Sequence, residues 1–201
     1  MKKSENPEKS VLKTPRLILR PWQESDAEEL YRYAKDPQIG PACGWNPHRS
    51  VAESAEIIKK VLSVPGTYAV TERPEAEAPP ALTKPIGSIG IFQSRADGAA
   101  PGDMEIGYWI GRPYWGRGLI PEAVNAMVDR CFSETDCRTI WCGYFDGNEK
   151  SRRVQEKCGF VYHHTRPDFF REPNGEKKTE HFTTLTRQRW LDRKQKEPGN
   201  R

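Results

Sequence analysis

The stretch GRPYWGRGLIP, residues 111–121, decides the fold that we expect for this chain. It stands between a segment with strand-like alternation and a segment whose apolar residues keep helical spacing. Glycines let the backbone turn tightly and expose successive N–H groups. The start of a helix adds unpaired N–H groups and a partial positive charge, and Pro121 falls where its missing N–H costs little. The stretch therefore predicts an anion-binding turn that suits a pyrophosphate.

Two common phosphate-binding classes do not fit this turn. A Rossmann fingerprint needs a third glycine three residues after Gly118, where the chain has Pro121. A Walker A loop needs Gly-Lys followed by Ser or Thr, which the turn lacks. An isolated Gly-x-Gly is also what an ordinary tight turn contains, so the interpretation depends on the elements around it.

The segment after the turn predicts a helix that crosses over to a parallel strand. Its apolar stripe consists of Ile120, Ala123, Val124, Met127, Val128 and Cys131. A strand is expected at residues 139–144, and a strand, a helix and a strand over about 40 residues make a right-handed crossover. Asn148 can then cap a short helix, and Gly159 stands where a glycine commonly ends one.

The segments before the turn predict an antiparallel meander. Strands are expected at residues 67–71, 86–92 and 104–110, with loops at 73–83 and 94–102. Further upstream, residues 16–20 predict a strand and residues 40–48 a loop. Two helices are expected there, one capped by Ser25 or Asp26 and ending before Pro37, the other capped by Ser50 and stopped by Pro65-Gly66.

The chain is expected to end in a strand pair at residues 160–164 and 179–186, with Asn174-Gly175 in the loop between them. Residues 1–13 are expected to be a flexible segment, 14–190 one domain, and 191–201 a charged tail that begins as a helix and then frays. The predicted fold class is α/β (α+β): a single domain whose mixed, mostly antiparallel sheet has one parallel β-α-β crossover and flanking helices.

Charge and composition narrow the possible functions. The chain has 201 residues and a formal net charge of +4. A mildly basic balance is explained by an ordinary solvated surface or by attraction to an anionic nucleotide cofactor. Nucleic acid is disfavoured as a partner, because no block of five or six consecutive basic residues occurs.

The five cysteines indicate a reducing compartment, and the apolar segments are too short to span a membrane. An odd cysteine count without a secretory signal argues against a disulfide framework and for a cytoplasmic location. No stretch approaches 18 apolar residues, so we expect no membrane span. The spacing of Cys137 and Cys142 disfavours a zinc site, and no metal is expected.

Three strings together resemble one family. They are EIGYWI at 105–110, WGRG at 115–118, and Asn148-xx-Ser151-xx-Val154-xx-Lys157-Cys158-Gly159-Phe160. In their order along the chain they resemble the GNAT superfamily of N-acetyltransferases. The nearest resemblance is to the branch that acetylates the N-terminal alanine or serine of ribosomal proteins, whose opening is similar to TPRLILR at 14–20. The resemblance covers roughly residues 14–187 and implies a GNAT fold.

The resemblance also implies a binding site for acetyl-CoA, the co-substrate. The backbone of Trp115, Gly116, Arg117, Gly118 and Leu119 would hold the pyrophosphate, with Ile120 next in the helix. The strand that includes Trp109 and Ile110 would pair with the pantetheine arm, splaying from the strand at 139–144. Asn148 and Ser151 would line the thioester end. The superfamily often has Gln or Arg where this chain has Pro113, a departure that the branch tolerates.

Acetyl transfer to an amine needs a proton acceptor and a donor for the leaving thiolate. Glu105 is the candidate base, with Asp103 as a weaker alternative. An ion pair with a basic neighbour on the sheet is the competing role for Glu105. Ser151 is the candidate acid, although its hydroxyl could instead simply bond the helix backbone. Many superfamily members have a tyrosine where this chain has Gln155.

Several alternatives stay open at this level. Tyr108 and Tyr144 are further candidate hydroxyls, and Trp45 is a candidate wall of the acceptor pocket. The acceptor is a protein N-terminus, favoured by the branch, or a small amine. A non-catalytic acyl-CoA-binding module that regulates a partner is the second hypothesis, and an RNA-binding accessory domain is the third. The chain is expected to act as a monomer or a homodimer.

Overall fold

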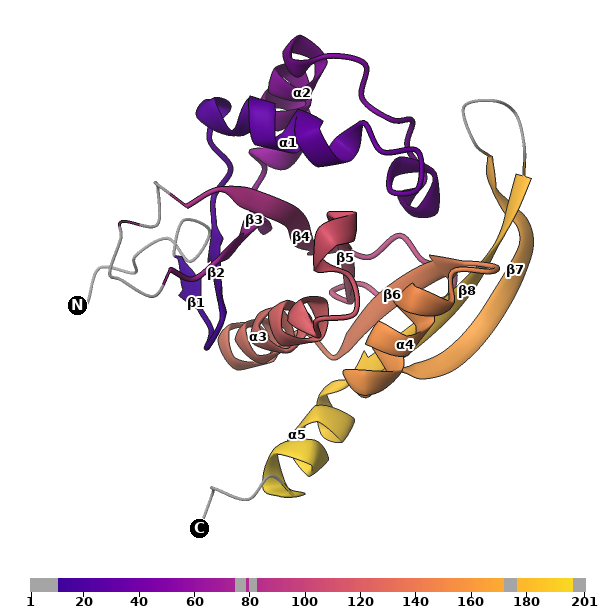
Figure 1. Cartoon of the computed structure of the whole chain (residues 1–201). Coiled ribbons are helices and arrows are strands. Elements are labelled where there is room, and N and C mark those ends of the chain that lie inside the picture. Colours follow the sequence, from indigo (N-terminus) through magenta and orange to yellow (C-terminus); the bar gives the residue numbers. More distant parts are fainter. Residues whose placement is uncertain (1–10, 75–78, 80–82, 172–176, 197–201) are drawn as a thin grey trace. The chain divides into compact units, whose positions relative to one another are not determined.

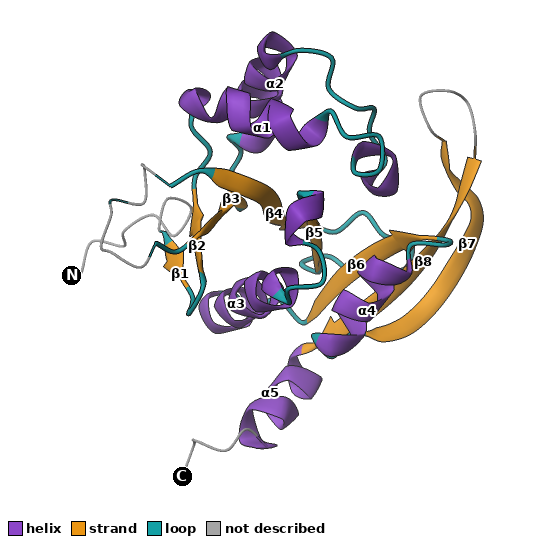
Figure 2. Ribbon diagram, viewed as in Figure 1, coloured by secondary structure: helices purple, strands orange, loops and turns teal. Residues whose placement is uncertain are grey.

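The computed structural model describes residues 11–74, 79, 83–171 and 177–196. Within them, eight strands form one mixed sheet in the order β1-β2-β3-β4-β5-β6-β8-β7 (Figures 1 and 2). The strands are β1 (Leu12–Lys13), β2 (Leu17–Arg20), β3 (Thr67–Glu72), β4 (Pro85–Gln93), β5 (Met104–Ile110), β6 (Thr139–Phe145), β7 (Val161–Arg171) and β8 (Lys177–Thr186). The α-helices are α1 (Ala27–Ala34), α2 (Val51–Ile57), α3 (Leu119–Glu134), α4 (Glu149–Lys157) and α5 (Arg187–Lys196).

The predicted fold class is confirmed. The strand pair β5 and β6 is parallel, whereas β1–β2, β2–β3, β3–β4, β6–β8 and β7–β8 are antiparallel. The helix α3 connects the two parallel strands, as expected for the crossover. The chain divides into two compact units, a first unit within residues 1–90 and 108–126 and a second unit within residues 91–107 and 127–201.

The first unit contains β1 to β3, the helices α1 and α2, and the Gly-rich turn with the start of α3. Figure 1 shows α1 and α2 beside one another, in agreement with their contacts. Their apolar sides enclose a core cluster made of Trp22, Ala27, Leu30, Ala34, Ile58 and Ala69. The strand β1 was not predicted, because we expected residues 1–13 to be a flexible segment, and Leu12–Lys13 instead pairs with β2.

The helix starts of the first unit were predicted with mixed success. Ser50 caps α2 as expected, since its side chain accepts a hydrogen bond from the amide of Glu53 at 3.0 Å. Asp26 occupies the N-cap position of α1, but its side chain does not cap the helix. Both carboxylate oxygens of Asp26 instead accept hydrogen bonds from Arg20 at 2.7 Å. Both side chains are buried, and a buried guanidinium without an anion would cost more free energy than a missing cap.

The second unit contains β6, β8 and β7, the helices α4 and α5, and the ends of β4, β5 and α3. The helix α4 packs against β6 (Figure 1). Asn148 caps α4 as predicted, and Gly159 follows with φ of +86°, the left-handed conformation expected of a C′ glycine. The final strands are longer than predicted. The Asn174-Gly175 loop and the end of the tail after Lys196 lie outside the described residues.

The apolar stripe predicted for α3 is confirmed by burial. Ile120, Ala123, Val124, Met127, Val128 and Cys131 are all buried. All five cysteines are free thiols. Among the described residues, no helix has the length and apolar composition that crossing a bilayer requires.

Candidate active site

The Gly-rich turn has the backbone conformation that its glycines permit. Residues Arg112–Tyr114 form a 3₁₀ turn, and Gly116 and Gly118 then adopt φ of +75° and +72°. Residues with a Cβ rarely adopt this left-handed region. A Cβ on Gly116 would meet no atom within 4 Å, so it is the backbone conformation that requires glycine there.

The turn presents amide groups, although not all of those that we expected. The amide of Trp115 donates to the carbonyl of Arg112 at 3.1 Å, so it belongs to the turn itself. The amides of Gly116, Arg117 and Gly118 donate to no other described residue. Leu119 and Ile120 begin α3, where first-turn amides have no partner within the helix. The amide group that can meet an anion therefore begins at residue 116.

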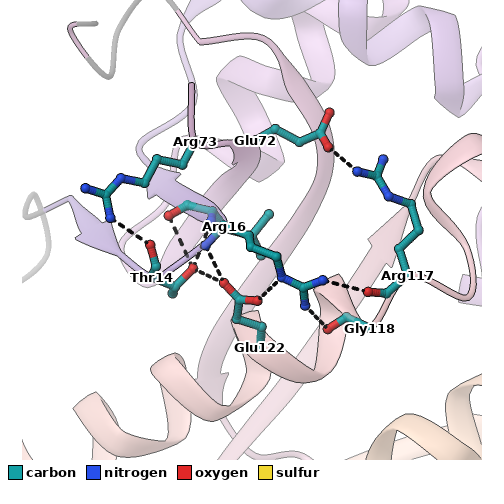
Figure 3. Close-up of polar contacts among 8 residues, drawn as sticks. Thr14, Arg16, Glu72, Arg73, Arg117, Gly118 and Glu122 are labelled. Carbon is teal, nitrogen blue, oxygen red and sulfur yellow. Dashed lines mark hydrogen bonds and ion pairs between the residues drawn. The ribbon is translucent and has the colours of Figure 1, made fainter. Parts of the chain in front are cut away.

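Arg16 holds the opposite, carbonyl side of the turn. Its guanidinium donates to the carbonyl of Arg117 at 2.9 Å and to the carbonyl of Gly118 at 3.1 Å (Figure 3). Its Nε donates to Glu122 on α3 at 2.7 Å. One planar side chain thus ties the two carbonyls of the turn to the first turn of the following helix.

Glu122 is the anion that keeps Arg16 in place. It accepts hydrogen bonds from the hydroxyl of Thr14 at 2.5 Å and from the backbone amide of Arg16 at 2.8 Å (Figure 3). Partial burial raises the pKa of Glu122, but the hydrogen bonds from Thr14 and Arg16 outweigh it and bring the pKa below its ordinary value. We call Thr14, Arg16 and Glu122 the clamp. Our sequence reasoning missed it, because more than 100 residues separate its parts.

The strand residues expected beside the pantetheine arm are partly engaged within the first unit. The carbonyl of Ile110 accepts a hydrogen bond from the indole of Trp115 at 2.9 Å. Trp109 packs against the core cluster, with its ring centroid 6.0 Å from that of Trp45. Trp45, which we considered as a wall of the acceptor pocket, thus packs against the core of the first unit.

In the second unit, a network of amides and hydroxyls surrounds Ser151. Asn148 accepts a hydrogen bond from the amide of Ser151 at 3.2 Å. The side-chain amide of Gln155 donates to the hydroxyl of Ser151 at 3.1 Å and to the carbonyl of Gly143 at 3.1 Å. The hydroxyl of Thr183 donates to the Oε1 of Gln155 at 2.7 Å. We call Ser151, Gln155 and Thr183 the amide network.

Gln155 stands where many members of the resembled superfamily have a tyrosine. Its side chain is buried, and its amide group is satisfied on both the donor and the acceptor side. Because Gln155 donates to Ser151, the oxygen of that hydroxyl acts as an acceptor there and its proton points elsewhere. The hydroxyl of Ser151, one helical turn before Gln155, thus has one acceptor position of its oxygen occupied.

The two carboxylates expected near the reaction differ in their surroundings. Asp103 is buried and accepts hydrogen bonds from the indole of Trp141 and the amide of Ala100, both at 3.0 Å, which gives it a structural role. Glu105 accepts from the hydroxyl of Ser94 at 3.3 Å and the amide of Arg95 at 3.2 Å. It forms no ion pair with another described residue, so the competing role for Glu105 is not observed.

Our sequence reasoning also missed Glu180, on β8. Burial, and then repulsion from Glu105, raises the pKa of Glu180 to about 7. Its carboxylate occupies the place that a side chain on Gly143 would need. An acidic residue inside a predicted strand was the available signal. Tyr144, a further candidate hydroxyl, stacks on His181 with the two ring centroids 4.9 Å apart. Burial raises the pKa of Tyr144.

The parallel ladder between β5 and β6 is short. Its register pairs are Met104 with Ile140 and Glu105 with Trp141, so the ladder ends within the second unit after Glu105. Among the described residues, no group of three or more His, Cys, Asp or Glu is arranged to hold a metal ion.

Comparisons with known proteins place this fold and these residues in a class. The model of the acetyltransferase (GNAT) domain matches residues 16–161. An uncharacterized N-acetyltransferase, p20 of Bacillus licheniformis, is 28% identical over 155 residues, which cover 75% of this chain and 82% of that protein. YdaF of Bacillus subtilis, named as a candidate ribosomal N-acetyltransferase, is 39% identical over 57 residues, 28% of this chain and 31% of its own.

A solved structure gives the same result for the fold. The microcin C7 self-immunity acetyltransferase MccE, in complex with acetyl-CoA and AMP, superposes with a TM-score of 0.69 at 17% identity and covers 86% of this chain and 93% of its own. The family model covers most of the chain. The protein therefore belongs to the GNAT acetyltransferase family, whose members transfer an acetyl group from acetyl-CoA.

Proposed function

We propose that this protein acetylates a primary amine, with a protein N-terminus as the favoured acceptor and a small amine as the alternative. The observation that carries the proposal is the Gly-rich turn, whose amides from Gly116 onward have no partner among the described residues while Arg16 occupies its carbonyls. A turn fixed in this way suits the pyrophosphate of a nucleotide cofactor. MccE, which shares the fold, was solved with acetyl-CoA.

The residues of this chain supply positions for the cofactor and a route for protons. We assign the pyrophosphate to residues 116–120, the pantetheine arm to the backbone of Trp109 and Ile110, and the thioester end to Asn148 and Ser151. The early end of the ladder between β5 and β6 supports this assignment, because backbone groups beyond it are not used in that pairing. When bound, acetyl-CoA supplies an activated acetyl group.

Acetyl transfer to an amine requires two proton transfers. The ammonium group of the acceptor must lose a proton before its nitrogen can attack, and Glu105 is the proposed base, acting directly or through a water. As the amide forms and the C–S bond breaks, the nitrogen loses a second proton and the thiolate takes one up. Ser151 is the proposed donor to the thiolate and takes up the proton of the nitrogen in turn, because Gln155 binds the oxygen of its hydroxyl and its proton points elsewhere. A strand amide is the proposed donor to the oxyanion.

The relatives support a protein N-terminus as the acceptor class. The partial match to YdaF, named as a candidate ribosomal N-acetyltransferase, favours a protein N-terminus. The test of the acceptor class is an acceptor screen. Peptides with varied first residues and a set of small amines are offered with acetyl-CoA, and the released thiol is measured. Release with small amines alone would replace the N-terminal acceptor by the alternative.

The turn itself is tested by a matched pair of glycine variants. Gly116 and Gly102 both have positive φ, and a Cβ on either would meet no atom within 4 Å. Gly116→Ala and Gly102→Ala therefore impose a similar backbone strain, about 1–2 kcal/mol. We expect only Gly116→Ala to weaken CoA binding in calorimetry. Wild-type protein that takes up no CoA would overturn the proposed function.

The lack of a tyrosine at position 155, where many superfamily members have one, favours one competing function, a CoA-binding module without catalysis. Gln155 stands in its place and has no proton to give to a thiolate at neutral pH. Calorimetric binding of CoA without thiol release across the whole acceptor panel would select this alternative.

A further inference from the structure

Glu180 lies on the same face of the sheet as Glu105, and the strand registers establish this. Side chains alternate between the two faces along a strand, and register partners share a face. Glu105 is the partner of Trp141, which shares its face with positions 143 and 145 of β6. Glu180 is the partner of Phe145. The two carboxylates therefore share one face, on either side of β6.

The opposite face of β6 and β8 carries the amide network. Thr183 alternates with Phe182 along β8, and its hydroxyl binds Gln155 of α4. The helix α4 thus lies on the Thr183 face, while Glu105 and Glu180 occupy the face that α4 leaves uncovered. A strand position between the two carboxylates is the glycine Gly143, and Glu180 extends into the space that a side chain there would fill.

The charged groups around Glu180 leave it without a cation. Arg166 is its register partner on β7 and binds Asp97 at 3.1 Å. The ammonium group of Lys178 lies 5.0 Å from the ring centroid of Phe145. Glu180 forms no ion pair with another described residue. Glu105 is the anion beside it, and the pKa of Glu180 is raised, by burial first and by Glu105 second.

We propose that Glu180 takes the proton of the acceptor ammonium and that Glu105, fixed by Ser94 and Arg95, is its neighbouring carboxylate. The inference rests on the proposed acetyl transfer and replaces Glu105 by Glu180 as the group that takes the proton. Glu105 becomes the anionic neighbour of Glu180. The N–H bond of the ammonium breaks, and its proton goes to a carboxylate oxygen of Glu180. The neutral nitrogen then bonds to the acetyl carbon, the C–S bond breaks, and the second proton that the nitrogen loses is passed to the thiolate. Glu180 returns its proton to water.

A carboxylate that titrates near neutral pH suits this step. An α-amino group has an ordinary pKa of about 8, and a base is most effective when its own pKa lies near the working pH. The pKa of Glu180, about 7, meets that requirement. An ordinary exposed glutamate, with a pKa of about 4.3, is a much weaker proton acceptor.

The test compares two amide variants over a range of pH. In the wild type, kcat/KM should rise with pH through an apparent pKa near 7. Glu180→Gln should lower kcat/KM at pH 8 by about 100-fold and remove that limb. Glu105→Gln should keep the limb but move it to lower pH, because the repulsion is gone. Glu134→Gln, a carboxylate on α3 paired with Arg130, is the control that leaves the profile unchanged.

A second readout does not depend on turnover. Carboxyl-labelled glutamate in the whole protein should give one resonance that titrates near pH 7, and Glu180→Gln should remove it while CoA binding by calorimetry stays unchanged. Gly143→Ala, which displaces the carboxylate, should lower kcat/KM although Glu180 is present.

Two results would overturn the inference. One is full turnover by Glu180→Gln at every pH; the other is a limb that Glu105→Gln alone removes. Failure of the proposed function looks different, since the wild type would then release no thiol with any acceptor, and Glu180 would lose its role with it.

Discussion

The Gly-rich turn of the first unit and the start of α4 in the second unit hold polar groups in opposite ways. The turn offers backbone amides, and charged side chains of the clamp fix it from the carbonyl side. The start of α4 offers a side-chain hydroxyl, and neutral, buried groups of the amide network fix it. Backbone groups bind a ligand whatever the side chains of the turn are, whereas a binding group on a side chain is lost when that residue is replaced.

The largest expected effect on these two regions comes from removing the clamp. Arg16→Ala should weaken CoA binding by about 100-fold, because charge-assisted hydrogen bonds to both turn carbonyls and to Glu122 are lost. Binding of a pantetheine thioester, which lacks the pyrophosphate, should not change. Arg73→Ala is the control, since Arg73 binds the carbonyl of Thr14 at 3.3 Å and does not contact the turn (Figure 3). Equal losses for both ligands would mean that Arg16 serves only the fold.

Removing Gln155, the centre of the amide network, should instead lower the free energy of unfolding. Gln155→Leu removes the buried hydrogen bonds of this side chain to the hydroxyl of Thr183, the carbonyl of Gly143 and the hydroxyl of Ser151, which we expect to cost about 2 kcal/mol in the free energy of unfolding. Urea denaturation measures this. Gln188→Leu on α5, where the side chain is exposed, provides the baseline, and a loss of equal size there would contradict the buried role of Gln155.

A smaller effect, on kcat, is expected from removing the hydroxyl of Ser151. Ser151→Ala should lower kcat by about 10-fold and leave the affinity for CoA unchanged, because a proton donor acts on the transition state. The exposed Ser133→Ala of α3 is the matched control. A rise in KM with kcat preserved would make Ser151 a binding residue and not an acid.

The smallest effect concerns Glu180 and the pH dependence of stability. Its pKa is raised from the ordinary 4.5 to about 7 in the folded state, so the folded protein binds the proton more tightly than the unfolded chain. Stability from this group is complete below pH 4.5 and is lost as the pH rises to 7. Glu180→Gln should therefore stabilise the protein at pH 8, by on the order of 1 kcal/mol for a partly exposed group, and not at pH 4. Thermal unfolding at both pH values checks the sign.

Local patterns predicted the parts of this molecule that depend on neighbouring residues. The positive φ of Gly116 and Gly118, the caps at Ser50 and Asn148, and the buried stripe of α3 all follow from short-range chemistry. The amide of Trp115, which we expected to face an anion, is instead used inside the Gly-rich turn.

What the sequence did not predict depends on residues far apart in the chain. The competition for Asp26 was decided by Arg20, which no capping rule includes. The clamp joins residues about 106 positions apart. The pairing of Glu105 and Glu180 needs the registers of three strands. A single sequence contains no signal for such contacts until the topology is known.

The clamp also makes the Gly-rich turn depend on residues about a hundred positions earlier in the chain. Thr14 and Arg16 come just after the first strand, and the turn that they support lies a hundred residues later. Trimming the protein by a protease up to Arg16 would leave every glycine of the turn in place and still disable it. Nascent protein emerging from the ribosome would likewise acquire a working turn only once Glu122 had been made, however early Arg16 was ready.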